Sequence, residues 1–306
     1  MTVSADTLRV GTRRSALARA QSGAVAAALG HVSGQPVEVV GISTYGDVAP
    51  GAIASLGGTG VFVSALRERL LAGEIDLAVH SYKDLPTAPQ PGLTIAAVPP
   101  REDPRDVLVS DVGPSLARLP HGARIGTGAP RRAAQIRAFR PDLQVAPLRG
   151  NVGTRIGAVA SGRLDGIVLA RAGLARLGRL SEVTEVLDPS VMLPAPAQGA
   201  LAVECRADDT RLRELLAHLD CSSSRAAVTA ERTLLAAVAA GCSAPLGALA
   251  ELSDDSLTLR AVIAAHDGAR VLRMSLTGAV TAAAELGHRL ATSLLAAGAA
   301  KLLEER

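Results

Sequence analysis

A loop with candidate acid–base chemistry follows the apolar segment 75–79 and reads His80-Ser81-Tyr82-Lys83-Asp84-Leu85-Pro86. Asp84 stands beside Lys83, one of two lysines in a chain with thirty arginines. A nearby cation favours a charged carboxylate, whereas desolvation in a cleft favours the neutral acid. A group balanced between the two suits proton transfer. Spacing alone also allows a capping aspartate beside a solvated lysine, so Asp84 is a candidate at this point.

Arginines recur directly after several predicted strands. In open α/β sheets, ligands bind at the carboxyl ends of the strands, and the helix N-termini there favour anions. A guanidinium matches a carboxylate bidentately. Such loops, if they converge, predict a site for a polyanion, although surface arginines are also ordinary in an arginine-rich chain. The arginines in these positions are Arg13, Arg14, Arg131, Arg132, Arg149, Arg155, Arg171 and Arg176.

The three cysteines, Cys205, Cys221 and Cys242, show no CxxC spacing, so neither a disulfide framework nor a zinc site is expected. A buried, inert thiol is the default for each. Cys242 differs because its neighbours in Gly-Cys-Ser-Ala-Pro indicate a fixed, exposed loop. The glycine-rich segments 57–60 and 126–128 lack the remainder of a phosphate loop or dinucleotide fingerprint.

Composition excludes several classes of protein. Hydrophobic residues make up 48% of the 306 residues, enough for a substantial core. Aromatic residues make up 1% and Trp is absent, which argues against stacking on nucleobases despite a pI near 9.0. The net charge of +3 is small, so any strong positive field must be local. No apolar run approaches the roughly 20 residues of a membrane span, and residues 1–10 lack a signal-peptide pattern. We expect a cytoplasmic, metal-free protein.

Strand and helix patterns alternate along the first two thirds of the chain, which predicts parallel sheets flanked by helices. Two proline-rich segments, 99–105 and 193–200, mark crossings between two α/β units, and the strand after the second crossing should rejoin the first sheet. Expected strands are 8–12, 36–42, 75–79, 123–126, 143–148, 166–170 and 200–204. Expected helices are 15–29 (stopped by Gly30), 60–72, 130–139, 151–161 and 172–177.

The character of the sequence changes from Ser222 onward. A long helix to about Ala240, alternating segments to about Leu276 and a final Ala/Leu-rich helix predict a small α+β domain. We therefore predict three domains. They are an N-terminal α/β domain of residues 1–99 with 200–219, a second α/β domain of residues 100–199 and a C-terminal domain of residues 220–306.

Five motifs together resemble the hydroxymethylbilane synthase family, also called porphobilinogen deaminase. They follow the family's order and spacing across nearly the whole chain. The motifs are His80-Ser81-Tyr82-Lys83-Asp84-Leu85-Pro86, Leu148-Arg149-Gly150-Asn151-Val152-Gly153-Thr154-Arg155, Leu169-Ala170-Arg171-Ala172-Gly173-Leu174-Ala175-Arg176-Leu177-Gly178, Gln198-Gly199-Ala200 and Gly241-Cys242-Ser243-Ala244-Pro245-Leu246-Gly247.

The resemblance implies a monomeric transferase of tetrapyrrole (porphyrin and haem) biosynthesis. Such an enzyme joins four porphobilinogen molecules head to tail with loss of ammonia and releases hydroxymethylbilane by hydrolysis. The resemblance further implies a dipyrromethane cofactor bound by a thioether to Cys242, and a product handed to uroporphyrinogen-III synthase. The implied fold has two domains like type II periplasmic binding proteins, with mixed, mostly parallel sheets, plus a C-terminal domain carrying the cofactor cysteine.

The resemblance also assigns roles to individual residues. Asp84 matches the catalytic aspartate, which would assist departure of the amino group, stabilise the cationic pyrrole and steer deprotonation. Each pyrrole carries an acetate and a propionate, so the growing chain is a polycarboxylate. Positions matched to cofactor binding are Cys242, Lys83, Ser81, Asp84, Arg131, Arg132, Arg149 and Arg155; those matched to substrate binding are Arg13, Ser15, Gln21, Arg149, Arg155, Arg176 and Gln198.

The chain departs from the family pattern at several positions. Gly128-Ala129-Pro130 replaces the usual Ser-Ser-Leu, Thr59 and Ser64 stand where lysines are common, and Ala197 replaces a glycine. Loss of one neutral hydrogen bond costs about 0.5–1.5 kcal/mol, which suggests tuned affinity rather than lost chemistry. The main alternative is a non-catalytic anion-binding module of the periplasmic-binding-protein type. An acyl- or phosphate-transfer enzyme using Cys242 would lack a nearby histidine or a phosphate loop.

Overall fold

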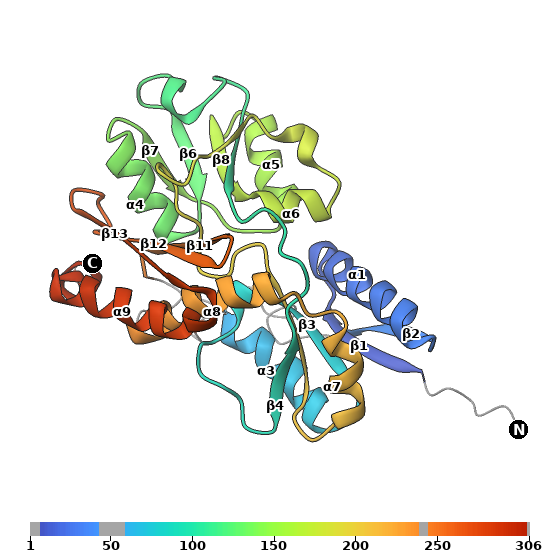
Figure 1. Ribbon diagram of the computed structural model, residues 1–306. Helices are drawn as coiled ribbons and strands as arrows, with labels where there is room; N and C mark the ends of the chain where they lie inside the picture. The colour runs from blue at the N-terminus through green and yellow to red at the C-terminus, as the bar shows by residue number, and fades with distance from the viewer. Residues whose placement is uncertain (1–6, 43–58, 239–243, 305–306) are drawn as a thin grey trace, which may run out of the picture. The chain divides into compact units, whose positions relative to one another are not determined.

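The computed structural model describes residues 7–42, 59–238 and 244–304, leaving aside the side chains of residues 59–62 and 304. The chain divides into two compact units, each formed by two stretches of sequence. The first unit is Met1–Arg101 with Ala200–Arg225, and the second is Glu102–Gly199 with Ala226–Arg306. Most elements of each unit are labelled in Figure 1.

The first unit is built on a five-stranded sheet with strand order β2-β1-β3-β10-β4. Strand β1 runs parallel to β2 and β3, whereas β10 runs antiparallel to β3 and β4. The strand after the second crossing therefore rejoins the first sheet, as predicted. The strands are β1 Leu8–Arg13, β2 Val37–Ile42, β3 Leu77–Ser81, β4 Leu93–Ala97 and β10 Leu201–Arg206; the helices are α1 Ala16–Ser33, α3 Thr59–Leu71 and α7 Thr210–Ala217.

Helix α1 is capped at both ends by side chain and backbone geometry. The Ser15 hydroxyl accepts a hydrogen bond from the backbone N–H of Ala18, as an N-cap residue does. The helix ends at Gly34, whose φ of 65° is left-handed. The predicted stop at Gly30 is wrong, because Gly30 lies within the helix. Val25 and Leu29 pack into the core of the sheet and hold the helix start near the end of β1.

The second unit repeats this arrangement in a sheet with strand order β7-β6-β8-β5-β9. Strand β6 runs parallel to β7 and β8, and β5 runs antiparallel to β8 and β9. The strands that follow the two crossings, β5 and β10, thus occupy the same place in the two sheets. The strands are β5 Asp106–Ser110, β6 Arg124–Thr127, β7 Gln144–Pro147, β8 Gly166–Ala170 and β9 Glu185–Val186; the helices are α4 Pro130–Phe139, α5 Val152–Ala160 and α6 Arg171–Arg176.

The C-terminal part is a three-stranded antiparallel sheet packed against helices, as expected. Leu234, Leu259 and Leu290 are buried in one core formed by a helix, a strand and a second helix. Its elements are α8 Ser222–Ala237, β11 Leu246–Ser253, β12 Ser256–Ala264, β13 Val271–Ala279, α9 Ala283–Ala296 and α10 Ala299–Glu304. The fold class is confirmed: two mixed α/β sheets and a small α+β part.

The second crossing segment is held by a buried carboxylate. Glu231 of α8 is fully buried and accepts hydrogen bonds from the backbone N–H groups of Ala197, at 2.6 Å, and Ala250, at 2.8 Å. Ala197 adopts a φ of 61°, which costs a non-glycine residue about 1–2 kcal/mol. The family's glycine at this position would adopt the same backbone without that strain.

We expect Gly199→Ala to lower the free energy of unfolding by about 2–4 kcal/mol. Gly199 has a φ of 87°, and an added Cβ would collide with the carbonyl oxygen of Glu102. Gly162→Ala is a matched control, because Gly162 has a φ of 67° with nothing within 4 Å of the added Cβ. In the control, the free energy of unfolding should fall by only about 1–2 kcal/mol, which is the cost of placing a non-glycine residue in the left-handed conformation. Equal losses in urea unfolding of the two variants would contradict the collision.

Candidate active site

A cavity of about 110 Å³ lies in the first unit at the carboxyl ends of β1 and β3. Asp84 lines it, together with four other residues assigned to the site from the sequence. The polar residues of the lining are Arg13, Ser15, Gln21, His80, Ser81 and Asp84. The topology brings these residues together because β1 and β3 are adjacent and parallel in the sheet.

Local structure fixes each of these side chains. Arg13 is the last residue of β1, and Ser15 is the N-cap of α1. Gln21 is buried on α1, and its amide nitrogen donates a hydrogen bond to the Ser81 hydroxyl at 2.9 Å. Asp84 ends a 3₁₀ turn, Tyr82–Asp84, that directly follows β3. The cavity therefore places one carboxylate and one guanidinium among hydroxyl, amide and imidazole groups.

The turn that carries Asp84 is anchored on both sides. The backbone N–H of Tyr82 donates to the carbonyl of Ala200 at 3.1 Å, and the N–H of Leu85 donates to the carbonyl of Tyr82 at 3.2 Å. Leu85 is buried against Val63 and Ala202. Asp84 is thus presented from a fixed backbone. Lys83, in the same turn, is half-buried and is not part of the cavity lining.

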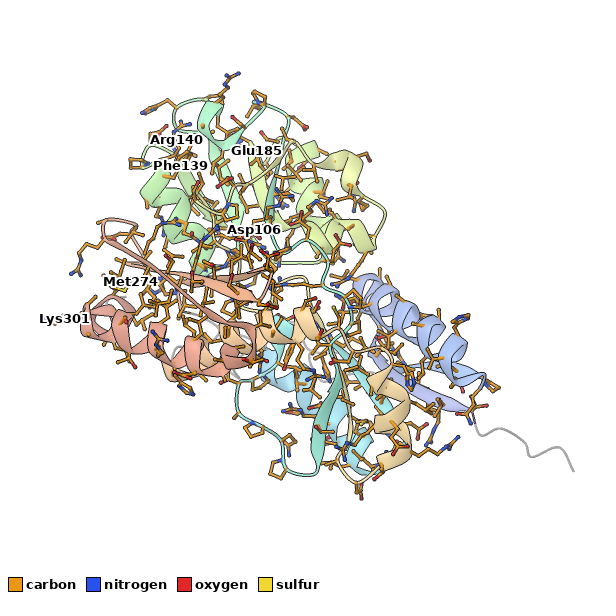
Figure 2. The ribbon with its side chains drawn as sticks, in the orientation of Figure 1. Asp106, Phe139, Arg140, Glu185, Met274 and Lys301 are labelled. Atoms are coloured by element: carbon orange, nitrogen blue, oxygen red, sulfur yellow. The ribbon has the colours of Figure 1, made fainter. Side chains whose placement is uncertain are left out.

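A second cluster of predicted site residues surrounds Asp106, the first residue of β5, in the second unit (Figure 2). The Asp106 carboxylate is fully buried and lies 2.8 Å from a guanidinium nitrogen of Arg131 and 2.8 Å from one of Arg132. Burial alone would raise the pKa of Asp106, but the charges of Arg131 and Arg132 hold it well below its usual range. Both arginines, in the first turn of α4, therefore point inward.

Gln198 joins this cluster instead of facing an open pocket. Its amide nitrogen donates to the Asp106 carboxylate at 2.7 Å and to the carbonyl of Pro104 at 2.7 Å. The side chain therefore links the second crossing segment to the first. Substrate binding by Gln198 stays a prediction. In this structure its side-chain amide is hydrogen-bonded to Asp106.

Three further arginines of the second unit differ in their surroundings. Burial lowers the pKa of Arg155, and the nearby charge of Arg132 lowers it further. Burial also lowers the pKa of Arg176. Arg155 donates to the carbonyl of Gly150 at 2.8 Å and Arg176 to that of Gly199 at 2.6 Å. Arg149 is exposed in the loop after β7. A desolvated guanidinium that bonds only carbonyl groups gains charge compensation from a bound carboxylate.

Comparison with known proteins decides the family. The model for the porphobilinogen deaminase dipyromethane cofactor binding domain matches residues 8–214, and that for the porphobilinogen deaminase C-terminal domain matches residues 225–296. Porphobilinogen deaminase 1 of Streptomyces coelicolor is 56% identical over 312 residues, covering 98% of this chain and 98% of that protein. The Mycobacterium tuberculosis porphobilinogen deaminase is 55% identical over 305 residues, covering 97% and 98%. The chain belongs to the porphobilinogen deaminase family.

Two solved structures align with part of the chain at low sequence identity. A periplasmic substrate-binding protein of an ABC transporter from Coxiella burnetii aligns with a TM-score of 0.44 at 15% identity, over 69% of this chain and 91% of that one. An ancestral cationic amino acid solute-binding protein aligns with a TM-score of 0.42 at 18% identity, over 70% and 87%. At these TM-scores neither alignment supports an argument about fold or function.

The departures from the porphobilinogen deaminase pattern have local consequences. A Cβ added to Gly128 would lie 2.6 Å from the carbonyl oxygen of Leu148, so the usual serine does not fit this backbone without a shift. Ala129 is the N-cap of α4 and makes no side-chain capping bond. Ser64 is exposed on α3 and is not part of the cavity lining. The side chain of Thr59 lies outside the described residues.

The cofactor cysteine of the porphobilinogen deaminase family matches Cys242, which lies outside the described residues. Both described cysteines are free thiols. Burial raises the pKa of Cys205 to about 11, which makes it a poor nucleophile. Hydrogen bonds with Ser223 and Ser224 lower the pKa of Cys221. Cys221 is therefore the more reactive of the two described thiols.

Across the described ranges, no group of three or more His, Cys, Asp or Glu is arranged to hold a metal ion. None of the helices in the described part of the chain has the length and apolarity that a membrane span requires.

Sequence reasoning missed two acidic residues that are buried within strands. Asp106 opens the apolar strand Asp-Val-Leu-Val-Ser, and Glu204 lies within the apolar strand Leu-Ala-Val-Glu-Cys-Arg. A carboxylate in a buried strand needs a partner of opposite charge. An acidic residue within an apolar strand pattern was therefore the signal that could have predicted these pairs. Asp106 pairs with arginines, and Glu204 pairs with His80 and Arg67.

Proposed function

We propose that the chain catalyses the hydroxymethylbilane synthase reaction. In this reaction four porphobilinogen molecules condense head to tail with loss of four molecules of ammonia, and the linear tetrapyrrole is released by hydrolysis. Membership of the porphobilinogen deaminase family supports this assignment. The structural observation that supports it most directly is the cavity of the first unit, which is lined by Asp84 together with Arg13, Ser15, Gln21 and Ser81.

The groups of this cavity suit porphobilinogen, which carries an amine, a pyrrole N–H and two carboxylates. The Asp84 carboxylate accepts hydrogen bonds from the pyrrole N–H and the amine, and stabilises the positive charge that develops as ammonia leaves. The Arg13 guanidinium and the Ser15 hydroxyl bind substrate carboxylates. Gln21 and Ser81, bonded to each other, support the wall of the cavity and orient the ring.

The second cluster suits the acidic side chains of a dipyrromethane cofactor. Arg132 Nε is buried and has no hydrogen-bond partner among the described residues, and Arg155 is desolvated and repelled by Arg132. A carboxylate between them removes both penalties. When bound through a thioether to Cys242, the cofactor supplies the free pyrrole carbon from which the chain grows. We assign its carboxylates to Arg131, Arg132, Arg149 and Arg155, with Ser81 and Lys83, and later substrate units to Arg149, Arg155, Arg176 and Gln198.

Intact mass spectrometry and turnover of purified protein test this function together. We expect wild-type protein from a haem-competent host to carry a covalent dipyrrole and to convert porphobilinogen to hydroxymethylbilane. Cys242→Ser should lose both the added mass and turnover. Cys221→Ser should keep both, because Cys221 follows strand β10 and helix α7 and is not part of the cavity. An unmodified wild-type mass without turnover would instead support the non-catalytic anion-binding module.

We propose further that the enzyme acts in the cytoplasm as a monomer and passes its product to uroporphyrinogen-III synthase. The chemistry of the product supports the last point, because an open-chain tetrapyrrole must be closed by another enzyme. We also propose the three-domain division at 1–99 with 200–219, 100–199 and 220–306, in which the C-terminal domain carries Cys242. The antiparallel sheet of β11, β12 and β13 with its own buried core supports that division.

A further inference from the structure

A group of three ionisable side chains, two of them buried, lies beside the Asp84 cavity. His80 lines the cavity and is 6% exposed. Its Nε2 lies 3.2 Å from Oε2 of Glu204. Arg67 donates hydrogen bonds to both oxygens of the same carboxylate at 2.8–3.1 Å. Glu204 is 2% exposed, and the function proposed above uses none of the three side chains.

The sheet and a helix fix this group together. In the antiparallel pairing of β3 with β10, His80 lies opposite Ala202, and Glu204 lies opposite Ala78. Because side chains alternate between the faces of a sheet, His80 and Glu204 project from the same face. Arg67 approaches that face from α3. Burial alone would raise the pKa of Glu204, but His80 and Arg67 beside it hold that pKa below its usual value. Glu204 therefore stays ionised, with one carboxylate oxygen 3.2 Å from the imidazole Nε2.

Few polar side chains of the cavity lining have an atom that can accept a proton. The Arg13 guanidinium has no acceptor atom, and the serine hydroxyls and the Gln21 amide are not basic. Among the polar side chains of the lining, Asp84 and His80 remain. The choice between the two matters because the condensation releases a proton.

The two tasks assigned to Asp84 conflict electrostatically. A carboxylate stabilises a developing cation only while it is ionised, and it loses that charge on accepting a proton. Each addition joins a new ring to the free carbon of a ring already bound, which is first the cofactor's ring and then that of the last substrate added. The ring carbon that forms the new bond must then lose its hydrogen as a proton. A second acceptor in the same cavity leaves Asp84 charged throughout.

We propose that His80, oriented by Glu204, is the proton acceptor of the Asp84 cavity. The carboxylate beside Nε2 selects the tautomer in which Nε2 carries the hydrogen and Nδ1 is the basic atom. The ring C–H bond breaks, its electron pair returns to the ring, and the proton moves to Nδ1. The proton then passes to the ammonia released in the same addition, giving ammonium and restoring the neutral imidazole. The inference rests on the proposed function.

The test uses cofactor-loaded His80→Gln and porphobilinogen with hydrogen or deuterium at its free ring carbon. Glutamine keeps an amide donor for Glu204 but removes the basic nitrogen. We expect kcat to fall about 10²–10³-fold, with a much smaller change in KM. The deuterium isotope effect on kcat should rise above that of the wild type, because loss of the ring hydrogen becomes rate-limiting. A purely structural role would not change the isotope effect.

Controls separate this inference from the proposed function. Absence of turnover in the wild type would refute the function itself, whereas the His80 result is read only against an active wild type. His218→Gln removes an exposed imidazole of the same unit and should change neither rate nor isotope effect. Glu204→Gln should show a smaller loss of rate with a raised isotope effect. If His80→Gln does not fold, the Glu204→Gln result tests the proposal in its place. A His80→Gln rate within twofold of wild type, or a slow rate with an unchanged isotope effect, would overturn the proposal.

Discussion

Asp84→Asn is expected to lower turnover by about 10²–10⁴-fold while leaving the covalent cofactor in place. Asparagine has nearly the same shape and can still accept a hydrogen bond, but it has no charge to stabilise the cation that forms as ammonia leaves. The 3₁₀ turn is anchored through the backbone of Tyr82 and the buried side chain of Leu85. The substitution therefore leaves the loop in position. Steady-state kinetics with intact mass spectrometry measure both consequences.

Asp208→Asn is the matched control for this experiment. Asp208 is an exposed aspartate of the same unit and is not part of the cavity lining, so its loss of charge should leave turnover unchanged. An Asp84→Asn enzyme within twofold of the wild-type rate would refute the electrostatic role. An Asp84→Asn protein that is folded but lacks the dipyrrole would move the role of Asp84 from turnover to cofactor assembly.

The second large effect concerns Asp106. We expect Asp106→Asn to lower the free energy of unfolding by about 3–5 kcal/mol, because it leaves the buried charges of Arg131 and Arg132 without their counter-ion. The amide also presents a donor where Gln198 already donates to the carboxylate. Urea unfolding measures the loss. Asp165→Asn tests a partly exposed Asp–Arg pair of the same unit and should cost no more than about 1 kcal/mol. Equal losses in the two variants would contradict the buried-pair argument.

The same residue predicts a pH dependence of stability. The arginines hold the pKa of Asp106 below that of the unfolded chain, so the folded state favours the ionised carboxylate. This contribution is present above the unfolded carboxyl pKa of about 3.9 and declines as the pH falls from there towards the folded pKa. The Asp106→Asn variant should therefore lose less stability than the wild type on acidification below about pH 4. If the stability of the two proteins fell equally on acidification, Asp106 would be excluded as a source of the pH dependence.

Sequence pattern predicted the Asp84 site better than it predicted the arginine cluster. Arg13, Ser15 and Asp84 lie at or just after the ends of strands that are parallel neighbours, so the rule for the carboxyl ends of strands was sufficient. For Arg131 and Arg132 the same rule gave the right location but could not give their orientation. They point inward because Asp106, at the far end of a crossing segment, lies beneath them, and no local pattern links these positions.

Elements with weak local signals were not predicted. Strands β4 and β5 and helix α7 are short and lie next to turns or proline-rich segments. The antiparallel insertion of β10 beside β3 depends on contacts between residues more than a hundred positions apart. The end of α1 was placed at Gly30 because glycine often ends helices, yet Gly34 is the residue in the left-handed conformation.

The strand order of the first sheet has a consequence for synthesis on the ribosome. Strand β4 pairs with β10, and β10 lies between β3 and β4. A nascent chain that has released Ala97 must therefore extend to Leu201 before the sheet can close. At about 5–20 residues per second, those 104 positions take roughly 5–20 s. During that interval β3 is an open edge strand and β4 has no neighbouring strand. Their unpaired backbone groups are then what a co-translational chaperone would shield.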